Sequence, residues 1–225
     1  MATRNKTALV TGANKGIGLE TVRQLATQGY EVYLGCRDQK KGEAAVAALH
    51  AAGLTATSLV VVDVTDEASI QAAVAALTAQ LPYLDVLVNN VGIASDPQRA
   101  ASDPSLFGEQ AASLVPAQTL RTLFDTNFFG TIAVTQHLLP LLGRAPQPRI
   151  VNLSSSLGSL AVQSDPAFPQ NDTKLTAYTA SKAALNAFTV MLASELRDTS
   201  FKVNSVNPGF TATDMNQHLG HLTTA

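Results

Sequence analysis

Short apolar runs alternate with longer amphipathic stretches along most of this chain. The short runs are typical of buried strands, and the longer stretches repeat their apolar residues every three or four positions, as helices do. The expected strands cover residues 6–11, 31–36, 57–62, 84–89, 149–153 and 201–206. The expected helices cover residues 16–28, 39–52, about 66–81, 120–142 and 176–197.

The helix expected near residues 66–81 has the clearest pattern. Thr65 or Asp66 can cap its first turn, and Ile70, Val74 and Leu77 form one apolar stripe that continues to Leu81. Glycines follow three of the other predicted helices, as expected for left-handed helix ends. These glycines are Gly29, Gly53 and Gly143.

Strands that alternate with helices predict right-handed βαβ units and a parallel sheet. We therefore expect one domain over residues 1–225: an α/β, doubly wound Rossmann fold. Such sheets bind ligands at the carboxyl ends of their strands. Two long loops, at residues 93–116 and from 154 to about 175, also fall on that edge. Loops of this length usually have a function or move.

The composition limits the classes of partner that this chain is expected to bind. Hydrophobic residues make up 46% of the 225 residues, charged residues only 14%, and the formal net charge is −2. The sequence has no basic block and no apolar run of about 18 residues, so we expect neither a nucleic-acid partner nor a membrane one. The single cysteine, Cys36, fits a reducing, cytoplasmic location. The four histidines have no metal-ligand spacing, and we expect no metal site.

A glycine-rich turn, containing Gly12, Gly16 and Gly18, follows the first predicted strand. Without side chains there, the backbone can approach a pyrophosphate, and the helix N-terminus that follows favours negative charge. Its spacing differs from the common G-x-G-x-x-G pattern. The alternative is a tight turn without a ligand, but its position between strand and helix favours a dinucleotide site.

The end of the second predicted strand bears on cofactor choice. An NAD site usually has an acid there, whereas this chain has Cys36 followed by Arg37, with Asp38 one position too late. A guanidinium can hold a 2′-phosphate through paired hydrogen bonds, and Lys15 can add a second positive charge. These residues predict NADP(H), although both are also explained as ordinary surface charges.

Tyr178 and Lys182 lie four residues apart in a predicted helix and so share a face. The lysine charge is expected to lower the pKa of the phenol, so that Tyr178 can pass a proton near neutral pH. Alone this pair is a weak signal, because it recurs by chance in helices.

Together these motifs resemble those of the short-chain dehydrogenase/reductase family, in family order across residues 6–214. The turn 11–18 is similar to the family's T-G-x-x-x-G-x-G, and 89–92 to its N-N-A-G with Val91 in place of alanine. Four further segments match the adenine-contacting acid, the strand-five serine, the Y-x-x-x-K pair and P-G-x-x-x-T. The resemblance implies cofactor contacts from Gly12, Asn14, Lys15, Gly16, Ile17, Gly18, Arg37, Asp63, Val64, Asn90, Val91, Gly92, Tyr178, Lys182, Pro208, Gly209, Thr211 and Thr213.

The resemblance also implies a reaction and its catalytic residues. A hydride passes from NADPH to a carbonyl carbon while Tyr178 protonates the developing alkoxide and Ser155 hydrogen-bonds the same oxygen. Ser155 is chosen over its two serine neighbours because it stands three positions before the motif glycine, Gly158. Lys182 is expected to tune Tyr178 and hold the nicotinamide ribose, and Asn127 to orient a water of the proton relay. Taken alone, Asn127 is equally explained as a helix-kink or capping residue.

The segment around Asn127, together with Lys15, is similar to that of the NADPH-dependent carbonyl reductases of the family. We therefore expect an oxidoreductase for a small, largely apolar carbonyl or alcohol substrate. A non-catalytic NADP(H)-binding protein of the same fold is the alternative.

Two departures from the family pattern matter. Ser155 and Tyr178 are 23 positions apart, whereas the family usually has about a dozen residues between them. A similar insertion occurs in the monomeric carbonyl reductases, and this favours a monomer. After Met215 only ten residues remain where the family continues with a lid helix and a seventh strand. We therefore expect six strands, and either a native protein that continues beyond Ala225 or a truncated member that only binds its cofactor.

Overall fold

The computed structural model describes residues 5–97, 110–168 and 174–224. Its centre is a parallel sheet with the strand order β3-β2-β1-β4-β5-β6. The strands are β1 (Thr7–Val10), β2 (Glu31–Cys36), β3 (Thr57–Val61), β4 (Val86–Asn89), β5 (Arg149–Leu153) and β6 (Lys202–Val206). The six-stranded α/β fold predicted from the sequence is confirmed.

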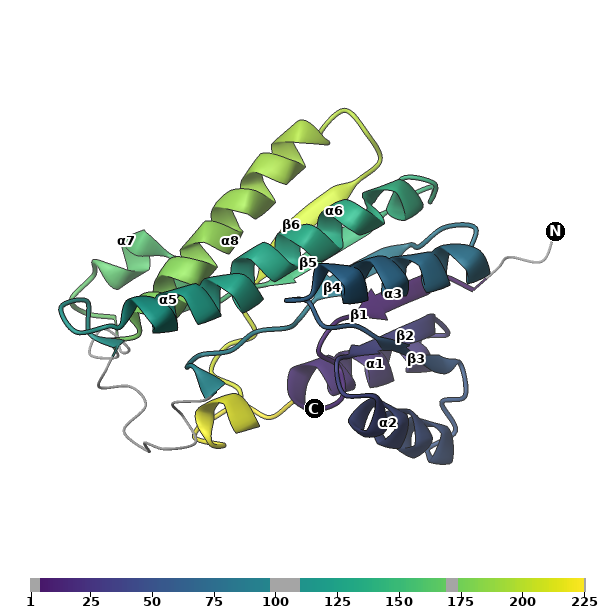
Figure 1. Ribbon diagram of the computed structural model, residues 1–225, viewed down its shortest axis with the longest axis horizontal. Coiled ribbons are helices and arrows are strands. Elements are labelled where there is room, and N and C mark those ends of the chain that lie inside the picture. The colour runs from purple at the N-terminus through teal and green to yellow at the C-terminus, as the bar shows by residue number, and fades with distance from the viewer. Residues whose placement is uncertain (1–4, 98–109, 169–173, 225) are drawn as a thin grey trace.

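Helices cover both faces of this sheet (Figure 1). One face packs against α1 and α2, which contribute Val22 and Leu49 to its core. The other face packs against α3, α6 and α8, which contribute Leu77, Leu138 and Leu192. The helices are α1 (Gly16–Thr27), α2 (Gln39–Ala51), α3 (Glu67–Gln80), α5 (Ala117–Phe124), α6 (Gly130–Leu142), α7 (Leu160–Gln163) and α8 (Thr176–Glu195).

The apolar stripe predicted for α3 is confirmed. Ile70, Leu77 and Leu81 are buried, and Val74 packs partly buried against the same core. The Asp66 side chain caps the helix by accepting a hydrogen bond from the backbone N–H of Ala68, at 2.9 Å. This burial attaches α3 to the sheet beside β3 and fixes where the end of that strand lies.

The long helix predicted over residues 120–142 differs in one respect. It begins at Ala117, and the turn Asp125–Phe129 between α5 and α6 is a π-helix, in which the N–H of Gly130 donates to the carbonyl of Asp125. A Cβ on Gly130 would lie 2.6 Å from the Val64 carbonyl oxygen, so the helix passes against the end of β3 at a distance only glycine allows. Sequence periodicity did not predict this turn, because a single extra residue inside a long helix is too local a feature for a periodic pattern to reveal.

The topological switch point lies between β1 and β4, from which the chain winds outward in both directions. The residues after β1, β4, β5 and β6 therefore meet along the carboxyl edge of the sheet. The described part of the second long loop contains a 3₁₀ turn, Ser156–Gly158, and α7. Much of the first long loop lies outside the described residues.

Candidate active site

The glycine turn after β1 has the backbone that its sequence predicted. Gly12 and Gly16 have φ angles of +64° and +59°, values that favour glycine. Gly18 has no room for a side chain, since a Cβ there would lie 2.8 Å from the Gly12 carbonyl oxygen. Asn14, Lys15 and Ile17 lie in the same turn, which opens directly into the N-terminus of α1.

The end of β4 is joined to this turn by hydrogen bonds. The Asn90 side-chain amide donates to the carbonyls of Thr11 and Gly12 at 2.9 and 3.0 Å. Val91 packs so close that a Cβ on Gly12 would lie 2.9 Å from its Cγ2. The turn and the predicted cofactor residues Asn90, Val91 and Gly92 therefore form one unit at the switch point.

Three of the predicted catalytic residues come together beside this unit. Tyr178 and Lys182 lie one turn apart in α8, and the Lys182 Nζ is 5.7 Å from the centre of the Tyr178 ring. Ser155 follows β5 and hydrogen-bonds the Tyr178 hydroxyl. The Ser155 Oγ also accepts the N–H of Leu157 at 3.2 Å, which fixes its position.

Lys182 is a buried cation. Only 3% of it is exposed, and its Nζ donates to the Leu153 carbonyl at 2.7 Å. Burial disfavours the charged form and lowers the pKa of Lys182 to about 8. Lys182 therefore keeps most of its charge at pH 7 and loses it as the pH rises through about 8.

The pKa of Tyr178 moves opposite to the direction we expected. Burial raises it, and the hydrogen bond from Ser155 opposes that change. The expectation from the sequence considered only the charge of Lys182. In the structure the loss of solvent around the phenol has a larger effect on its pKa than the hydrogen bond from Ser155.

Asn127 lies at the π-turn, and both polar atoms of its side chain have protein partners. Its Oδ1 accepts the N–H of Ile93 at 2.8 Å, and its Nδ2 donates to the Ile93 carbonyl and to Ser181 Oγ at 2.9 and 3.0 Å. The amide thus fixes α8, one residue before Lys182, against the chain that leaves β4. π-Turns occur frequently at functional sites.

A second polar cluster, missed in the sequence, lies buried beneath these residues. The Asn89 amide donates to Asn152 Oδ1 and Thr135 Oγ1 at 2.8 and 2.9 Å, and the Asn152 amide donates to Thr189 Oγ1 at 2.9 Å. All four side chains are buried. They join β4 and β5 to α6 and α8, so the strand ends and the catalytic helix are fixed together. Two asparagines at inward-facing strand positions were the signal that could have revealed this.

The nucleotide side of the site is more exposed. Arg37 follows β2 and is exposed, as is Lys15, which lies at the N-cap of α1. Asp63 Oδ1 accepts the N–H and the hydroxyl of Thr65 at 2.9 and 2.7 Å, so it orders the turn between β3 and α3. Val64 is buried beside it.

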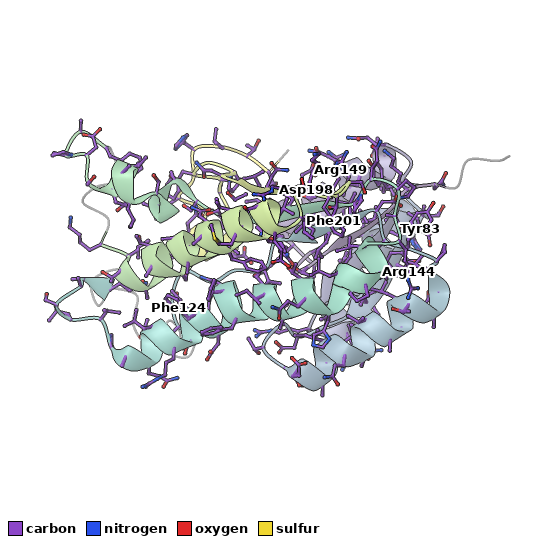
Figure 2. The ribbon with its side chains drawn as sticks, turned by 90° about the horizontal axis from the view of Figure 1, so that it is seen from above. Tyr83, Phe124, Arg144, Arg149, Asp198 and Phe201 are labelled. Carbon is purple, nitrogen blue, oxygen red and sulfur yellow. The ribbon has the colours of Figure 1, made fainter. Side chains whose placement is uncertain are left out.

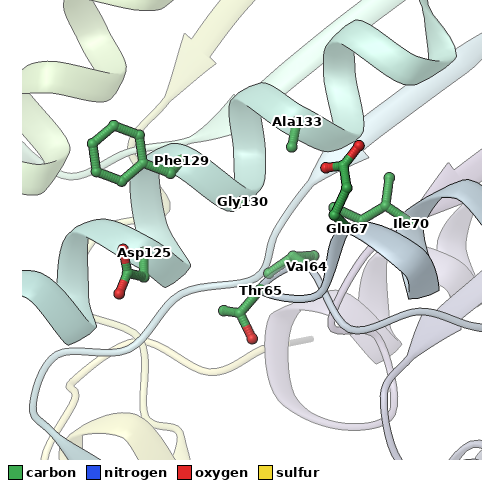
Figure 3. Close-up of a pocket in the computed structure, with 8 residues that line it drawn as sticks. All are labelled: Val64, Thr65, Glu67, Ile70, Asp125, Phe129, Gly130 and Ala133. Carbon is green, nitrogen blue, oxygen red and sulfur yellow. The ribbon is translucent and has the colours of Figure 1, made fainter.

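Val64 also lines an open pocket of about 250 Å³ between that turn and the π-helix (Figure 3). Phe129 and Gly130 form its other wall, and Asp125 and Glu67 place two carboxylates at its rim. Neither Tyr178 nor Lys182 lines this pocket, so it lies beside the candidate adenine position and not at the catalytic residues.

The segment after β6 crosses the carboxyl edge of the sheet. Thr211 Oγ1 donates to the Pro208 carbonyl at 3.0 Å, and Gly209 has a φ of +75°. A Cβ on Gly16 would lie 3.6 Å from Thr213 Cγ2, so the segment reaches the glycine turn. Figure 1 shows this yellow segment beside the purple start of α1.

Across the described ranges, no group of three or more His, Cys, Asp or Glu side chains could hold a metal ion. Nor does any described helix combine the length and apolar character needed to cross a membrane.

Comparisons with known proteins agree with this geometry. Residues 6–222 match the family model described as short chain dehydrogenase. Salutaridine reductase of Papaver bracteatum is 34% identical over 272 residues, covering 98% of this chain and 87% of that protein. (−)-Isopiperitenone reductase of Mentha piperita is 33% identical over 287 residues, covering 100% and 90%. The structure of NADPH-bound carbonyl reductase from chicken fatty liver is 28% identical with a TM-score of 0.82, covering 99% of this chain and 87% of that one.

Proposed function

The chain belongs to the short-chain dehydrogenase family of oxidoreductases, and we propose that it is an NADP(H)-dependent carbonyl reductase. The observation that carries this proposal is the convergence of Ser155, Tyr178 and Lys182 beside a glycine turn at the switch point of the sheet. A protein that only binds a dinucleotide has no need of a hydrogen-bonded serine–tyrosine pair with a buried lysine next to it.

The residues present fit a dinucleotide. The turn 12–18 leaves no space for a side chain on Gly12 or Gly18, and it presents the N-terminus of α1, which favours a pyrophosphate. Gly92 lies close to Lys182, because a Cβ on it would be 3.4 Å from the lysine Nζ. We propose that Gly92 and Lys182 hold the nicotinamide half and that Asp63 and Val64 hold the adenine.

When bound, the nicotinamide supplies the hydride. Tyr178 gives its phenolic proton to the carbonyl oxygen as negative charge develops there, and Ser155 donates a hydrogen bond to the same oxygen. Burial keeps Tyr178 protonated until that charge appears. The cationic Lys182, one helical turn away, favours the phenolate that is left.

Asn127 acts in this proposal as a positioning residue. Its amide binds the backbone of Ile93 and the Ser181 hydroxyl, and so sets the distance between Lys182 and Gly92. The water relay that we expected at Asn127 remains a prediction. Both N–H groups of the Asn127 side chain already donate to protein atoms, so such a water has to bind an atom other than Asn127 Nδ2.

The preference for NADP(H) rests on Arg37 and Lys15. Both are exposed cations beside the predicted nucleotide position, and the second strand lacks the acid that favours NAD. The NADPH-bound carbonyl reductase supports the same preference. A small apolar carbonyl compound is the proposed substrate class, in keeping with relatives that are named reductases.

The test is oxidation of NADPH and NADH in the presence of aldehydes, ketones, diketones and quinones. We expect turnover with NADPH, a loss of about 10²- to 10⁴-fold in Tyr178→Phe, and unchanged NADPH binding in that variant. Ser155→Ala is expected to lose activity, whereas Ser156→Ala, its matched control, is not. NADPH binding without turnover of any carbonyl favours the non-catalytic alternative, and a preference for NADH contradicts the roles given to Arg37 and Lys15.

A further inference from the structure

Residues Thr211 to Leu222 fold into a closed loop at the carboxyl edge of the sheet. Thr211 and Leu222 pair as a parallel bridge, and the N–H of Ala212 donates to the Leu222 carbonyl at 2.8 Å. Inside the loop, the Asn216 side chain accepts the N–H of Thr213 and donates to the Thr211 carbonyl at 3.0 and 2.9 Å. The gate segment, as we call residues 211–222, is therefore a folded unit.

The gate segment contains strained backbone. Gln217 and His218 have φ angles of 53° and 61°, which non-glycine residues rarely adopt in succession. Such strain persists only where contacts elsewhere hold the chain in place.

One such contact is an ion pair with the glycine turn. The Asp214 Oδ2 lies 2.5 Å from the Lys15 Nζ, and the other carboxylate oxygen lies 3.0 Å from His218 Nε2. Lys15 holds the pKa of Asp214 below its usual value, so the carboxylate is charged at neutral pH. Lys15 is also one of two cations proposed to bind the cofactor 2′-phosphate.

The residue after Asp214 reaches the catalytic end of the site. The position that a Cβ on Gly92 would take is 3.8 Å from Met215 Cε, 3.4 Å from Lys182 Nζ and 3.6 Å from Asn127 Oδ1. The Met215 methyl group thus lies where Gly92 and Lys182 are proposed to hold the nicotinamide half.

We propose that the gate segment closes the cofactor site, and that the Lys15–Asp214 ion pair is the latch that holds it closed. This inference rests on the proposed function, since it assigns a regulatory device to the same site. A cofactor has to displace Met215, and the latch has to open. A 2′-phosphate replaces Asp214 as the partner of Lys15, whereas NADH offers Lys15 no replacement.

The latch predicts an unusual response of NADH binding to mutation. Lys15→Met opens the latch, so it tightens NADH binding while it weakens NADPH binding. Asp214→Asn also opens it and tightens the binding of both cofactors. Both side chains are more than half exposed, so the expected gain is about two- to five-fold in Kd, the size of an exposed ion pair.

The double variant Lys15→Met/Asp214→Asn completes the cycle. It should bind NADH as tightly as either single variant, because both substitutions remove the same interaction. Asp198→Asn and Lys202→Met are the charge-matched controls. Figure 2 shows Asp198 near Arg149, the first residue of β5, so both controls lie at the opposite ends of the strands. They should leave both affinities unchanged.

If Lys15 only binds a 2′-phosphate, Lys15→Met leaves NADH affinity unchanged, and this result overturns the latch. Additive gains for NADH in the double variant overturn it too, because they show that the two side chains act separately.

A measurement without cofactor separates the latch from the proposed function. The chain has three methionines, so ¹³C-methyl methionine NMR gives three signals. Both latch variants should shift the Met215 signal and leave that of Met191, an exposed residue of α8, unchanged. Shifts at Met215 in a protein that binds neither cofactor support the latch but contradict the proposed function. An unmoved Met215 signal overturns the latch, whatever the cofactor binding.

Discussion

The two ends of the candidate site are built differently. At the catalytic end, Lys182 and Asn127 are buried, and each of their polar side-chain atoms that we describe has a protein partner. At the nucleotide end, Lys15 and Arg37 lie exposed at the ends of a turn and a strand. The catalytic end therefore depends on desolvation and fixed geometry, whereas the nucleotide end depends on charges that solvent screens. Substitutions at the first should have large effects on chemistry, and those at the second small effects on affinity.

The largest effect should come from Lys182. Lys182→Met removes the cation beside Tyr178, and we expect turnover to fall by at least about 10²-fold. The same substitution should raise thermal stability at pH 7, because it replaces a buried charge with an apolar side chain of similar length. Steady-state kinetics and thermal unfolding measure the two effects. A Lys182→Met protein that turns over normally contradicts the assignment of Lys182.

The stability effect should depend on pH. The pKa of Lys182 is about 8 in the folded protein and 10.5 without burial, so folding releases a proton between these values. Below pH 8 the buried charge costs about 3 kcal/mol, and this cost disappears as pH rises to about 10.5. The stability advantage of Lys182→Met over wild type should therefore be largest near pH 7 and shrink toward pH 10. Urea unfolding across this range tests the sign, and a gap that widens with pH contradicts it.

The next effect concerns Gly18, where the two ends meet. A Cβ there would lie 2.8 and 2.9 Å from backbone atoms of Gly12 and Ala13, so Gly18→Ala forces the turn to move. We expect a loss of about 1–3 kcal/mol in unfolding free energy and weaker cofactor binding. Gly42→Ala, also in a helix, is the control, because its close contact is a flexible Leu59 methyl. Equal losses in both variants contradict a rigid turn.

A smaller effect, confined to cofactor affinity, should come from Arg37. Arg37→Met is expected to weaken NADPH binding about ten-fold, as for loss of one charge-assisted hydrogen bond, and to leave NADH binding and stability unchanged. Titration of both cofactors measures it. If NADPH and NADH affinities fall together, Arg37 supports the fold of the site and does not select the cofactor.

The same comparison explains how far the sequence could predict this molecule. The strands, the glycine turn and the Tyr178–Lys182 pair follow local periodicity or spacing, and the structure places them as expected. The π-turn at Asn127 depends on the close approach of Gly130 to Val64, which links residues 66 positions apart. The latch between Lys15 and Asp214 links residues 199 positions apart. No local pattern contains such contacts.

The predicted direction of the Tyr178 pKa shift was wrong for a related reason. Spacing shows which charge lies near the phenol, but only the packed structure shows how much water is lost around it. The buried amides of Asn89 and Asn152 were missed because polar residues at strand ends suggest a ligand before they suggest a tie between strands.

The π-turn requires a fixed number of residues in this part of the chain. A π-turn holds one residue more than an α-helical turn, so deleting one residue within Asp125–Phe129 would let the turn become α-helical and would change the spacing between Asn127 and Gly130. Either Gly130 would lose its close contact with Val64, or Asn127 would lose its hydrogen bonds to Ile93 and Ser181. Deletions of a single residue should therefore be tolerated in the surface loops and fail here, even where every side chain named in the mechanism is retained.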